Sequence, residues 1–409
     1  MSTRPPAPLK IALVVPGFAA DAADWCIPAL TNLARGLAAR PGVDLHVYAL
    51  RYPHRQATYR LRGATVHAFG GAPLAGRRVW GASLGLLWTT FLAALRREHR
   101  RAPFALLHGF WATESGYLTA VAGRMLGIPA LVHLAGGELV HDLATGYGNQ
   151  APGLARFLVA GSLRLATAIT VPSGTQRALL HRRYPAHTGK AVDWALGVDI
   201  AMFAPGVATP TSAPGANGPL RLVHAASLLP VKHQALLLDG LAAARTLAPD
   251  RPVALTVVGQ GPLERSLRAQ AARSGLGDIV TFAGNQDHAA LPALYRAHDA
   301  FVLTSRHEAQ CMAVLEAAAC GLPWIGPPVG ALADLAAAIP TNGWSVPPDD
   351  ALALGQAILA AGYPTGRIRR GAAARAAVER DYALDRQIDR LLDLYAGALG
   401  RASRPHSHP

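Results

Sequence analysis

Short apolar runs alternate with helix-like stretches along almost the whole chain. The runs predicted as strands are 11–15, 45–49, 105–107, 130–134, 168–171, 220–225, 254–258, 280–283, 300–303 and 324–325. Segments of ten or more residues with helical patterning separate most of them. Short buried strands joined by helices favour parallel sheets that are covered on both faces. The pattern therefore predicts an α/β protein.

One stretch interrupts this alternation and divides the chain. Residues 203–219 are rich in Pro, Gly, Ala and Thr, as linkers are. We therefore expect an N-terminal domain over 1–202 and a C-terminal domain over 220–380. A helix over 381–400 is predicted to pack back toward the N-terminal domain, followed by a loose tail over 401–409. Two α/β halves imply a cleft between them, lined by loops at the carboxyl ends of the strands.

Composition and net charge limit the classes of binding partner that we expect. The 409 residues are 51% hydrophobic and only 16% charged, and the net charge is +14, with Arg far more abundant than Lys. Such a charge favours an anionic membrane surface, phosphorylated substrates or nucleic acid. No helix-turn-helix, zinc-finger or aromatic RNA-binding signature accompanies it, so nucleic acid is not expected.

The cysteines and the apolar segments bear on location. Cys26, Cys311 and Cys320 are too few and too scattered for a disulfide framework or a zinc site, which favours a reducing cytoplasm. The start of the chain loosely imitates a secretory signal, but Pro16 interrupts the apolar run, and a buried first strand explains it better. The uncharged stretch 79–95 lies between Arg pairs and barely reaches the length of a membrane span. We expect a buried or membrane-apposed helix there, and a cytoplasmic protein that sits peripherally on the inner face of the membrane.

Residues 301–323 carry the strongest indication of chemistry. An apolar strand runs into a polar loop, and a helix follows that Gly321 ends; Glu308 in the loop and Glu316 in the helix are separated by seven residues. A strand end, a loop and a helix N-terminus together form an anion-binding mouth. Carboxylates beside it would repel phosphates, but they accept hydrogen bonds from sugar or ribose hydroxyls. The alternative is that both glutamates are solvated surface charges.

Three further segments of the C-terminal half fit a nucleotide site. A strand leads into Ser227-Leu-Leu-Pro-Val-Lys232-His, which offers a cation. Another strand ends in Gly259-Gln-Gly261-Pro, where glycine lets the backbone approach a ligand closely. The strand around Phe282 comes next. Each of these patterns also occurs in ordinary strand–turn–helix units, so their value lies in their combination.

Taken together, the segments from about Leu220 to Leu335 resemble the donor-binding half of retaining nucleotide-sugar glycosyltransferases of the GT-B fold, family 4. This resemblance implies two Rossmann-like, doubly wound parallel-sheet domains that face a cleft. It also implies a nucleoside-diphosphate sugar as co-substrate, with no cofactor and no metal. The chain has no Asp-x-Asp pair to hold a divalent ion on a diphosphate. Lys232 and helix dipoles would then neutralise the departing diphosphate.

The resemblance also implies roles for individual residues. Glu308 would hold the donor sugar, Glu316 the ribose hydroxyls and Lys232 the diphosphate. Glu308, Lys232 and His133 are the expected catalytic residues. Ser227 stands where relatives commonly have an Arg. The expected donor-binding residues are Gly17, Ser227, Lys232, Gly259, Gly261, Phe282, Glu308, Gln310, Cys311, Met312 and Glu316.

The N-terminal half resembles the family more loosely, and here the acceptor is expected. The acceptor would be a sugar, a lipid-linked molecule or an envelope glycan, and His108 and Glu138 are the candidates to bind it. Relatives often place an active-site His where this chain has Ala135. His133 lies two residues earlier on the same strand face, so it either substitutes or is a packed strand histidine.

Two other functions share this fold. A nucleotide-sugar epimerase or a sugar phosphorylase would need acid/base groups at the sugar ring or a lysine for pyridoxal phosphate, and no motif indicates either. A non-catalytic protein that binds nucleotide sugar or scaffolds an assembly is the alternative from another class. Ser227 and Ala135, the two departures from the family pattern, are what support that alternative.

Overall fold

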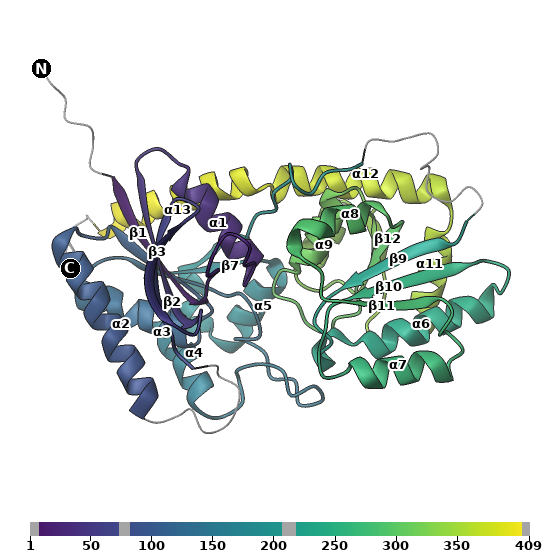
Figure 1. Cartoon of the computed structure of the whole chain (residues 1–409), viewed down its shortest axis with the longest axis horizontal. Helices are drawn as coiled ribbons and strands as arrows, with labels where there is room; N and C mark the ends of the chain where they lie inside the picture. The colour runs from purple at the N-terminus through teal and green to yellow at the C-terminus, as the bar shows by residue number, and fades with distance from the viewer. Residues whose placement is uncertain (1–7, 73–81, 207–217, 403–409) are drawn as a thin grey trace, which may run out of the picture.

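The computed structural model describes residues 8–72, 82–206 and 218–402. Within them the chain forms two α/β domains, which lie side by side in Figure 1, with the last two helices along both. The central part of the predicted linker, the start of the apolar stretch 79–95 and the end of the predicted tail lie outside the described residues.

The N-terminal domain is built on an eight-stranded sheet with the order β3-β4-β2-β1-β5-β6-β7-β8. Its strands are β1 Leu9–Gly17, β2 Val43–Tyr52, β3 Gln56–Leu61, β4 Ala64–Phe69, β5 Leu106–Phe110, β6 Ala130–His133, β7 Ala168–Val171 and β8 Ala191–Asp193. Its helices are α1 Pro28–Ala38, α2 Ala82–Arg101, α3 Glu114–Leu126, α4 Leu154–Leu165 and α5 Gly174–Arg183, followed by the 3-10 helix η1 Pro185–Lys190.

The sheet is parallel, as expected, except at one edge. β3 pairs with β4 in an antiparallel hairpin, whose turn holds Arg62 and Gly63, both at positive φ. The neighbouring pairs β2–β4, β1–β2, β1–β5, β5–β6, β6–β7 and β7–β8 are parallel. An antiparallel edge strand on a parallel sheet is common in doubly wound folds.

The C-terminal domain has a six-stranded parallel sheet with the order β11-β10-β9-β12-β13-β14. Its strands are β9 Leu220–Ala225, β10 Val253–Val258, β11 Val280–Gly284, β12 Ala300–Val302, β13 Trp324–Gly326 and β14 Gly343–Ser345. Its helices are η3 Pro230–Lys232, α6 Gln234–Leu247, α7 Glu264–Arg273, η4 His288–Ala290, α8 Leu291–Arg296, α9 Met312–Ala319, α10 Ala331–Ala338, α11 Ala351–Ala361 and α12 Pro364–Asp381. This is the strand order of a Rossmann fold. Two Rossmann-like domains, as expected, are therefore confirmed.

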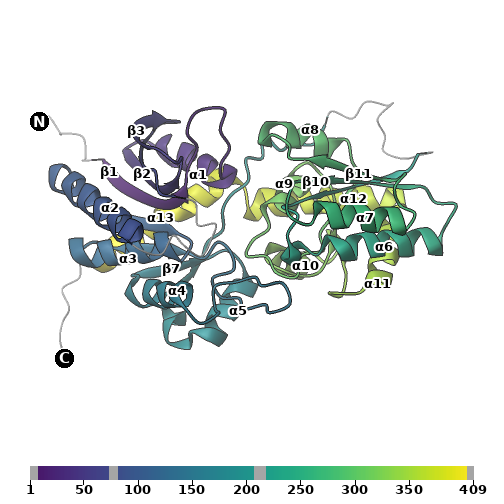
Figure 2. The same ribbon diagram turned by 60° about the horizontal axis from the view of Figure 1, so that its bottom comes forward.

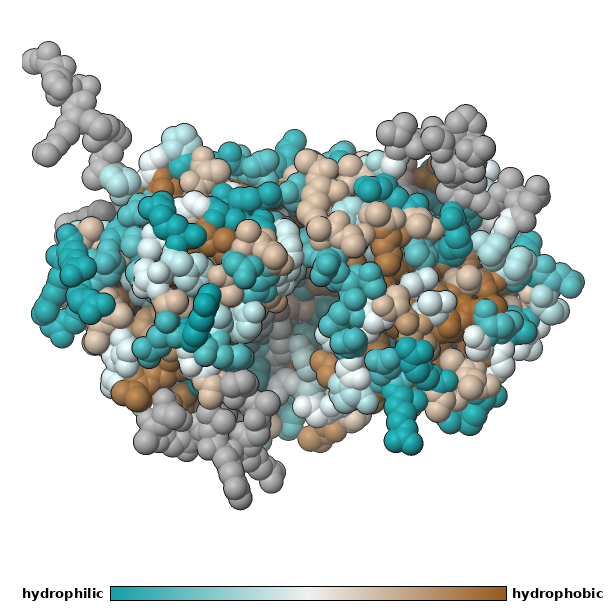
Figure 3. Space-filling model, viewed as in Figure 1, coloured by the Kyte–Doolittle hydropathy of each residue, from teal (hydrophilic) through white to brown (hydrophobic). Residues whose placement is uncertain are grey.

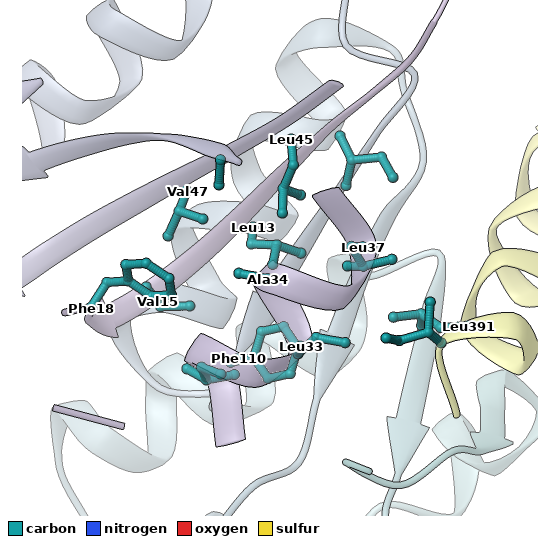
Figure 4. Packing of buried hydrophobic residues seen from close by; sticks show 14 of the residues in the cluster. Leu13, Val15, Phe18, Leu33, Ala34, Leu37, Leu45, Val47, Phe110 and Leu391 are labelled. Atoms are coloured by element: carbon teal, nitrogen blue, oxygen red, sulfur yellow. The ribbon is translucent and has the colours of Figure 1, made fainter. Parts of the chain in front are cut away.

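Helices cover both faces of each sheet and bury separate cores. In the N-terminal domain α1 packs its apolar face on β1 and β2: Figure 4 shows Leu33 and Leu37 against Leu13 and Val47. The other face is covered by α2, α3 and α4. In the C-terminal domain α8, α9, α10 and α12 cover one face, and α6, α7 and α11 cover the other.

The last helix, α13 Leu384–Ala402, returns to the N-terminal domain. Ile388, Leu391 and Tyr395 on its apolar face are buried in the core that contains α1. The preceding α12 packs on α9 of the C-terminal domain, so the two helices together tie the domains to each other (Figure 1). At this crossing Val198 and Leu384 are joined by a backbone hydrogen bond.

No described helix combines the length and the hydropathy that a membrane span requires. The part of the uncharged stretch that the structure describes belongs to α2, where Leu87, Phe91 and Leu95 are buried against the sheet. Leu86, by contrast, is 68% exposed.

Candidate functional site: the loops between the two domains

The two predicted catalytic residues of the C-terminal domain follow neighbouring strands. Each sheet has one pair of neighbouring strands at which the strand order reverses. This pair is β1 and β5 in the N-terminal sheet, and β9 and β12 in the C-terminal sheet. Loops that leave the carboxyl ends of such a pair diverge and open a crevice. The loop after β9 carries Lys232, and the loop after β12 carries Glu308. Figure 3 shows a hollow between the two domains, on the side where these loops lie.

Lys232 and Glu308 form the centre of the site. The Lys232 Nζ donates to Glu308 Oε1 over 2.6 Å, and the two side chains are 22% and 10% exposed. Burial alone would lower the pKa of Lys232, but the neighbouring Glu308 carboxylate outweighs it and raises that pKa. The Lys232 carbonyl also accepts from Thr304 Oγ1, at 3.0 Å, which fixes one loop on the other. The site thus holds a charged ammonium and a carboxylate at one point of the crevice.

The helix that follows Glu308 presents its N-terminus to the same place. Cys311, just before α9, is in the left-handed region (φ 73) and makes no side-chain cap hydrogen bond. The first N–H groups of a helix lack partners within it and suit an anion. Gly330, at φ +55, lies against this loop: a Cβ there would come within 2.9 Å of the Glu308 Cβ. The backbone of Gln310, Cys311 and Met312 therefore leads into the N-terminus of α9, where Gly330 packs closely against the loop.

The Gln310 side chain has a different role from the backbone next to it. Its Oε1 accepts from the Leu196 N–H at 2.9 Å, and its Nε2 donates to the Leu196 carbonyl at 2.6 Å. Close by, Ser173 Oγ donates to the Ala309 carbonyl at 2.7 Å. These bonds join the Glu308 loop to the N-terminal domain and to the segment that leads out of it.

Glu316 lies in α9, one turn deeper, and its partner was not predicted. His288 Nε2 is 3.0 Å from Glu316 Oε1, and both side chains are buried. Burial raises the pKa of Glu316, and the hydrogen bond from His288 opposes that rise. His288 follows β11 at the same edge of the sheet; its place after a strand end was the only signal in the sequence. His307, the other histidine missed here, lies beside Glu308 and contacts Gly136 and Gln176 of the N-terminal domain.

The glycines of the 259–261 turn are required by a neighbouring loop. A Cβ on Gly259 (φ +121) would lie 2.1 Å from the Ala226 carbonyl, and one on Gly261 2.5 Å from the Leu228 carbonyl. These glycines thus let two loops of the crevice pack together; the expected close approach of this backbone to a ligand stays a prediction. Ser227 is exposed on one of these loops.

The two remaining donor-binding candidates are Phe282, in the middle of β11, and Gly17, at the end of β1. The Phe282 ring stacks with the Arg268 guanidinium of α7, 4.7 Å away, so its side chain packs on a helix. Gly17 ends β1, where a Cβ would come within 3.0 Å of the Tyr52 Cβ. Their expected roles in donor binding stay predictions.

Glu138 is buried in the N-terminal domain and organises a loop of the crevice. Its carboxylate accepts from the N–H groups of Ala112, Ala135 and Gly136, at 3.3, 2.9 and 2.6 Å. Burial raises its pKa, and these backbone hydrogen bonds oppose the rise. With no exposed surface, Glu138 does not meet an acceptor directly, which corrects that expectation. It positions the 135–138 backbone, whose Gly136 carbonyl accepts from Gln176 at 3.0 Å.

His133 and His108 lie in the core and not at the crevice. His133 Nδ1 is 3.0 Å from Thr170 Oγ1, and His108 lies between Thr170 and the Tyr395 hydroxyl of α13. Both rings are fully buried. Of the two alternatives for His133, the structure supports the packed strand histidine; the expected role of His108 at the acceptor is corrected in the same way. Their inward orientation depends on partners far away in the chain.

These buried histidines predict that the protein is acid-sensitive. Burial lowers the pKa of His133 to about 3 and that of His224, a fully buried histidine of β9, to about 4, below the ordinary value of 6.5. Between the lowered pKa and the ordinary value of about 6.5, the unfolded chain binds more protons than the folded protein. The free energy of unfolding therefore decreases as the pH falls below about 6.5. Each such group contributes a slope of up to about 1.4 kcal/mol per pH unit. Denaturant unfolding at pH 7.5, 6.5 and 5.5 should show the loss, with a smaller slope for His133→Asn; a flat profile would contradict it.

Comparison with known proteins identifies the class. A family model described as "Glycosyl transferase 4-like domain" matches residues 27–192, and one described as "Glycosyl transferases group 1" matches residues 219–361. The two matches fall on the two Rossmann-like domains and together span most of the chain. The chain therefore belongs to the group 1, family 4 glycosyltransferases of the GT-B fold.

Individual relatives agree with this class. The chain is 30% identical over 260 residues to a D-inositol 3-phosphate glycosyltransferase of Jonesia denitrificans; the match covers 58% of this chain and 59% of the relative, thus less than two thirds of its length. Among solved structures, sucrose-phosphate synthase from Thermosynechococcus elongatus superposes with a TM-score of 0.75 at 22% identity, over 96% of this chain and 99% of that one. HepE of Anabaena, solved with UDP and glucose, gives a TM-score of 0.71 at 17% identity, over 95% and 100%. At these identities the two structures show a shared fold.

Proposed function

We propose that this protein is a retaining, metal-independent glycosyltransferase that moves a sugar from a nucleoside-diphosphate sugar to an acceptor bound by the N-terminal domain. The observation that carries the proposal is the meeting of Lys232 and Glu308 over 2.6 Å beside the N-terminus of α9. A cation and a helix N-terminus suit a diphosphate, and a carboxylate suits sugar hydroxyls. The family relationship and a structural neighbour solved with UDP and glucose support the same assignment.

The chemistry we propose follows from these groups. The bond between the anomeric carbon and the diphosphate oxygen breaks while the acceptor oxygen bonds to the same face of that carbon. The acceptor proton passes to the leaving phosphate oxygen, so no protein carboxylate is needed as a nucleophile. Lys232 and the first N–H groups of α9 would stabilise the charge that grows on the diphosphate. Metal independence is proposed because the sequence has no Asp-x-Asp pair and offers Lys232 in its place.

Nucleotide binding gives the simplest test. Thermal unfolding would be recorded with UDP, GDP, ADP and TDP, for wild type and for Lys232→Ala. One nucleotide at a hundredfold excess over its dissociation constant should add about 2.7 kcal/mol of stability, and less in the variant. Stabilisation by none of them would refute the donor site and leave a scaffold role as the better account.

We further propose that the acceptor is lipid-linked or part of an envelope glycan and that the N-terminal domain rests on an anionic membrane from the cytoplasmic side. The surface that supports this is the α2–α4 face, where α2, α3 and α4 lie side by side (Figure 2). Phe157 is 61% exposed there, and Leu86 is 68% exposed. The exposed arginines of these helices are Arg96, Arg97, Arg100, Arg101, Arg124, Arg156 and Arg164. Their two acidic residues are already paired, Glu98 with Lys10 and Glu114 with Arg51.

Flotation with vesicles tests this surface. Anionic vesicles should carry the protein at low salt and release much of it at high salt, because each arginine near an anionic surface contributes about 1 kcal/mol that ions screen. Replacing Arg96 and Arg97 with alanine should weaken the binding, whereas a matched Arg182→Ala, Arg183→Ala variant of α5 should change it less. If the protein does not float at low salt, the membrane proposal is wrong.

A further inference from the structure

His288 holds the carboxylate that the proposed donor site assigns to the ribose. Its Nε2 is 3.0 Å from Glu316 Oε1, and the two residues are 5% and 7% exposed. The other ring nitrogen, Nδ1, is buried and has no hydrogen-bond partner among the described residues. A histidine whose single hydrogen bond goes to one carboxylate oxygen is arranged to fix that carboxylate.

The His288 ring is itself held from outside its own domain. The Trp25 ring of the N-terminal domain lies 4.9 Å from it, tilted by 36°. Phe203, in the segment between the domains, lies 5.2 Å away and nearly edge-on. The imidazole of the C-terminal domain therefore contacts one aromatic ring of the N-terminal domain and one of the segment that joins the domains.

Trp25 is in turn a fixed residue, although it lies in the loop between β1 and α1. The Arg62 guanidinium lies over its ring at 4.4 Å. The loop is also secured by Asp24, whose carboxylate accepts from the Ala20 N–H at 2.7 Å and the Tyr52 hydroxyl at 2.8 Å. A chain of side-chain contacts thus connects the edge hairpin of the first sheet with the carboxylate proposed to bind ribose in the second domain. Its members are, in order, Arg62, Trp25, His288 and Glu316.

We propose that His288 is a positioning residue that presents Glu316 to the ribose, and that Trp25 keeps His288 in place. The nucleoside half of the donor site is then complete only when the two domains are together. A carboxylate has about four acceptor positions, so one bond from His288 leaves positions for the ribose hydroxyls. This inference rests on the proposed donor site and adds to it the means by which nucleoside binding depends on domain closure.

The hydrogen bond from His288 also affects the ionisation of Glu316, because the other groups around this carboxylate are uncharged. The other titratable groups near it are Tyr295 on α8, Cys311 before α9 and Cys320 after it; burial raises the pKa of each, which keeps them neutral at neutral pH. His288 is therefore the group that opposes the effect of burial on Glu316. Without it, the carboxylate would take up a proton at a higher pH and accept fewer hydrogen bonds from ribose.

The test compares ribonucleotides with their 2′-deoxy forms, by calorimetric titration of UDP, GDP and ADP at pH 6 and pH 8. His288→Leu should weaken binding of the ribonucleotide about tenfold and that of the 2′-deoxy form much less, with the larger loss at pH 6. His288→Gln, whose amide can still donate to Glu316, should keep most of the affinity. Trp25→Ala should reproduce part of the loss and Trp25→Phe little of it, at an unchanged unfolding midpoint.

Two results would overturn the inference. Equal losses for the ribonucleotide and the 2′-deoxy form would show that His288 supports the fold and does not serve the ribose. Unchanged binding in His288→Leu would show that Glu316 needs no positioning. If wild type binds none of the nucleotides, the proposed function fails and the inference fails with it; if wild type binds one and the variants do not alter the ribose preference, the inference alone fails.

Discussion

Replacing Lys232 with alanine is expected to lower donor turnover by about 10²- to 10³-fold, the usual loss when one group that stabilises a developing negative charge is removed. Lys232 is the only described cation that the structure pairs with Glu308, and its Nζ lies 2.6 Å from that carboxylate. The variant loses the charge that would face the leaving diphosphate, and it leaves a nearly buried carboxylate without its partner. Both effects act on the same step.

The measurement is release of nucleoside diphosphate from the preferred donor in the absence of acceptor. Lys232→Arg is the matched control: it keeps the charge but not the compact ammonium, and it should recover part of the rate. Lys190→Ala is not a suitable control, because Lys190 is half-buried and its Nζ donates to three carbonyls at the end of α4. Equal turnover in wild type and Lys232→Ala would remove Lys232 from the mechanism.

Replacing Glu114 with alanine is expected to destabilise the protein by about 3–5 kcal/mol, because it leaves a buried cation without its partner. Arg51 in β2 donates to both oxygens of Glu114, at 2.8 Å each, and Trp88 Nε1 on α2 donates to one of them at 2.7 Å. Arg51 and Glu114 are 7% and 8% exposed. This pair joins the sheet to α3 and α2, and thus supports the α2–α4 face.

Chemical denaturation of wild type and of two variants measures the effect. Glu264→Ala is the matched control, because Glu264 and Arg268 form an exposed pair one helical turn apart. Such pairs contribute about 0.3–0.5 kcal/mol. A loss for Glu114→Ala no larger than that for Glu264→Ala would show that the buried pair does not secure α3.

The sequence predicts those parts of the fold that depend on local pattern. Buried parallel strands are runs of apolar residues, so β1, β9 and β12 are recognisable without a structure. The hairpin of β3 and β4 is not, because Gln56–Leu61 alternates exposed and half-buried positions at a sheet edge. The strands β8 and β14 are not recognisable either, because each lies at a sheet edge and is only partly buried, unlike the equally short but fully buried β12.

Some residues of the candidate site could likewise be predicted from local sequence pattern, and others could not. Lys232 and Glu308 were predictable because each follows a strand, and the two strands flank the crevice of a doubly wound sheet. The position of His108 was not, because its partners Thr170 and Tyr395 lie 62 and 287 residues away and turn the ring inward. His288 was missed for the related reason that its partner lies on another element and no motif links the two.

The most direct test of the central claim is the release of nucleoside diphosphate from UDP-glucose, GDP-mannose, ADP-glucose and TDP-glucose by the purified protein without acceptor. The account predicts slow release from one of these donors, which Lys232→Ala reduces by about 10²-fold or more. Release from none of them, with no stabilisation by any of the nucleotides, would contradict a glycosyltransferase and favour a binding or scaffold protein of the same fold.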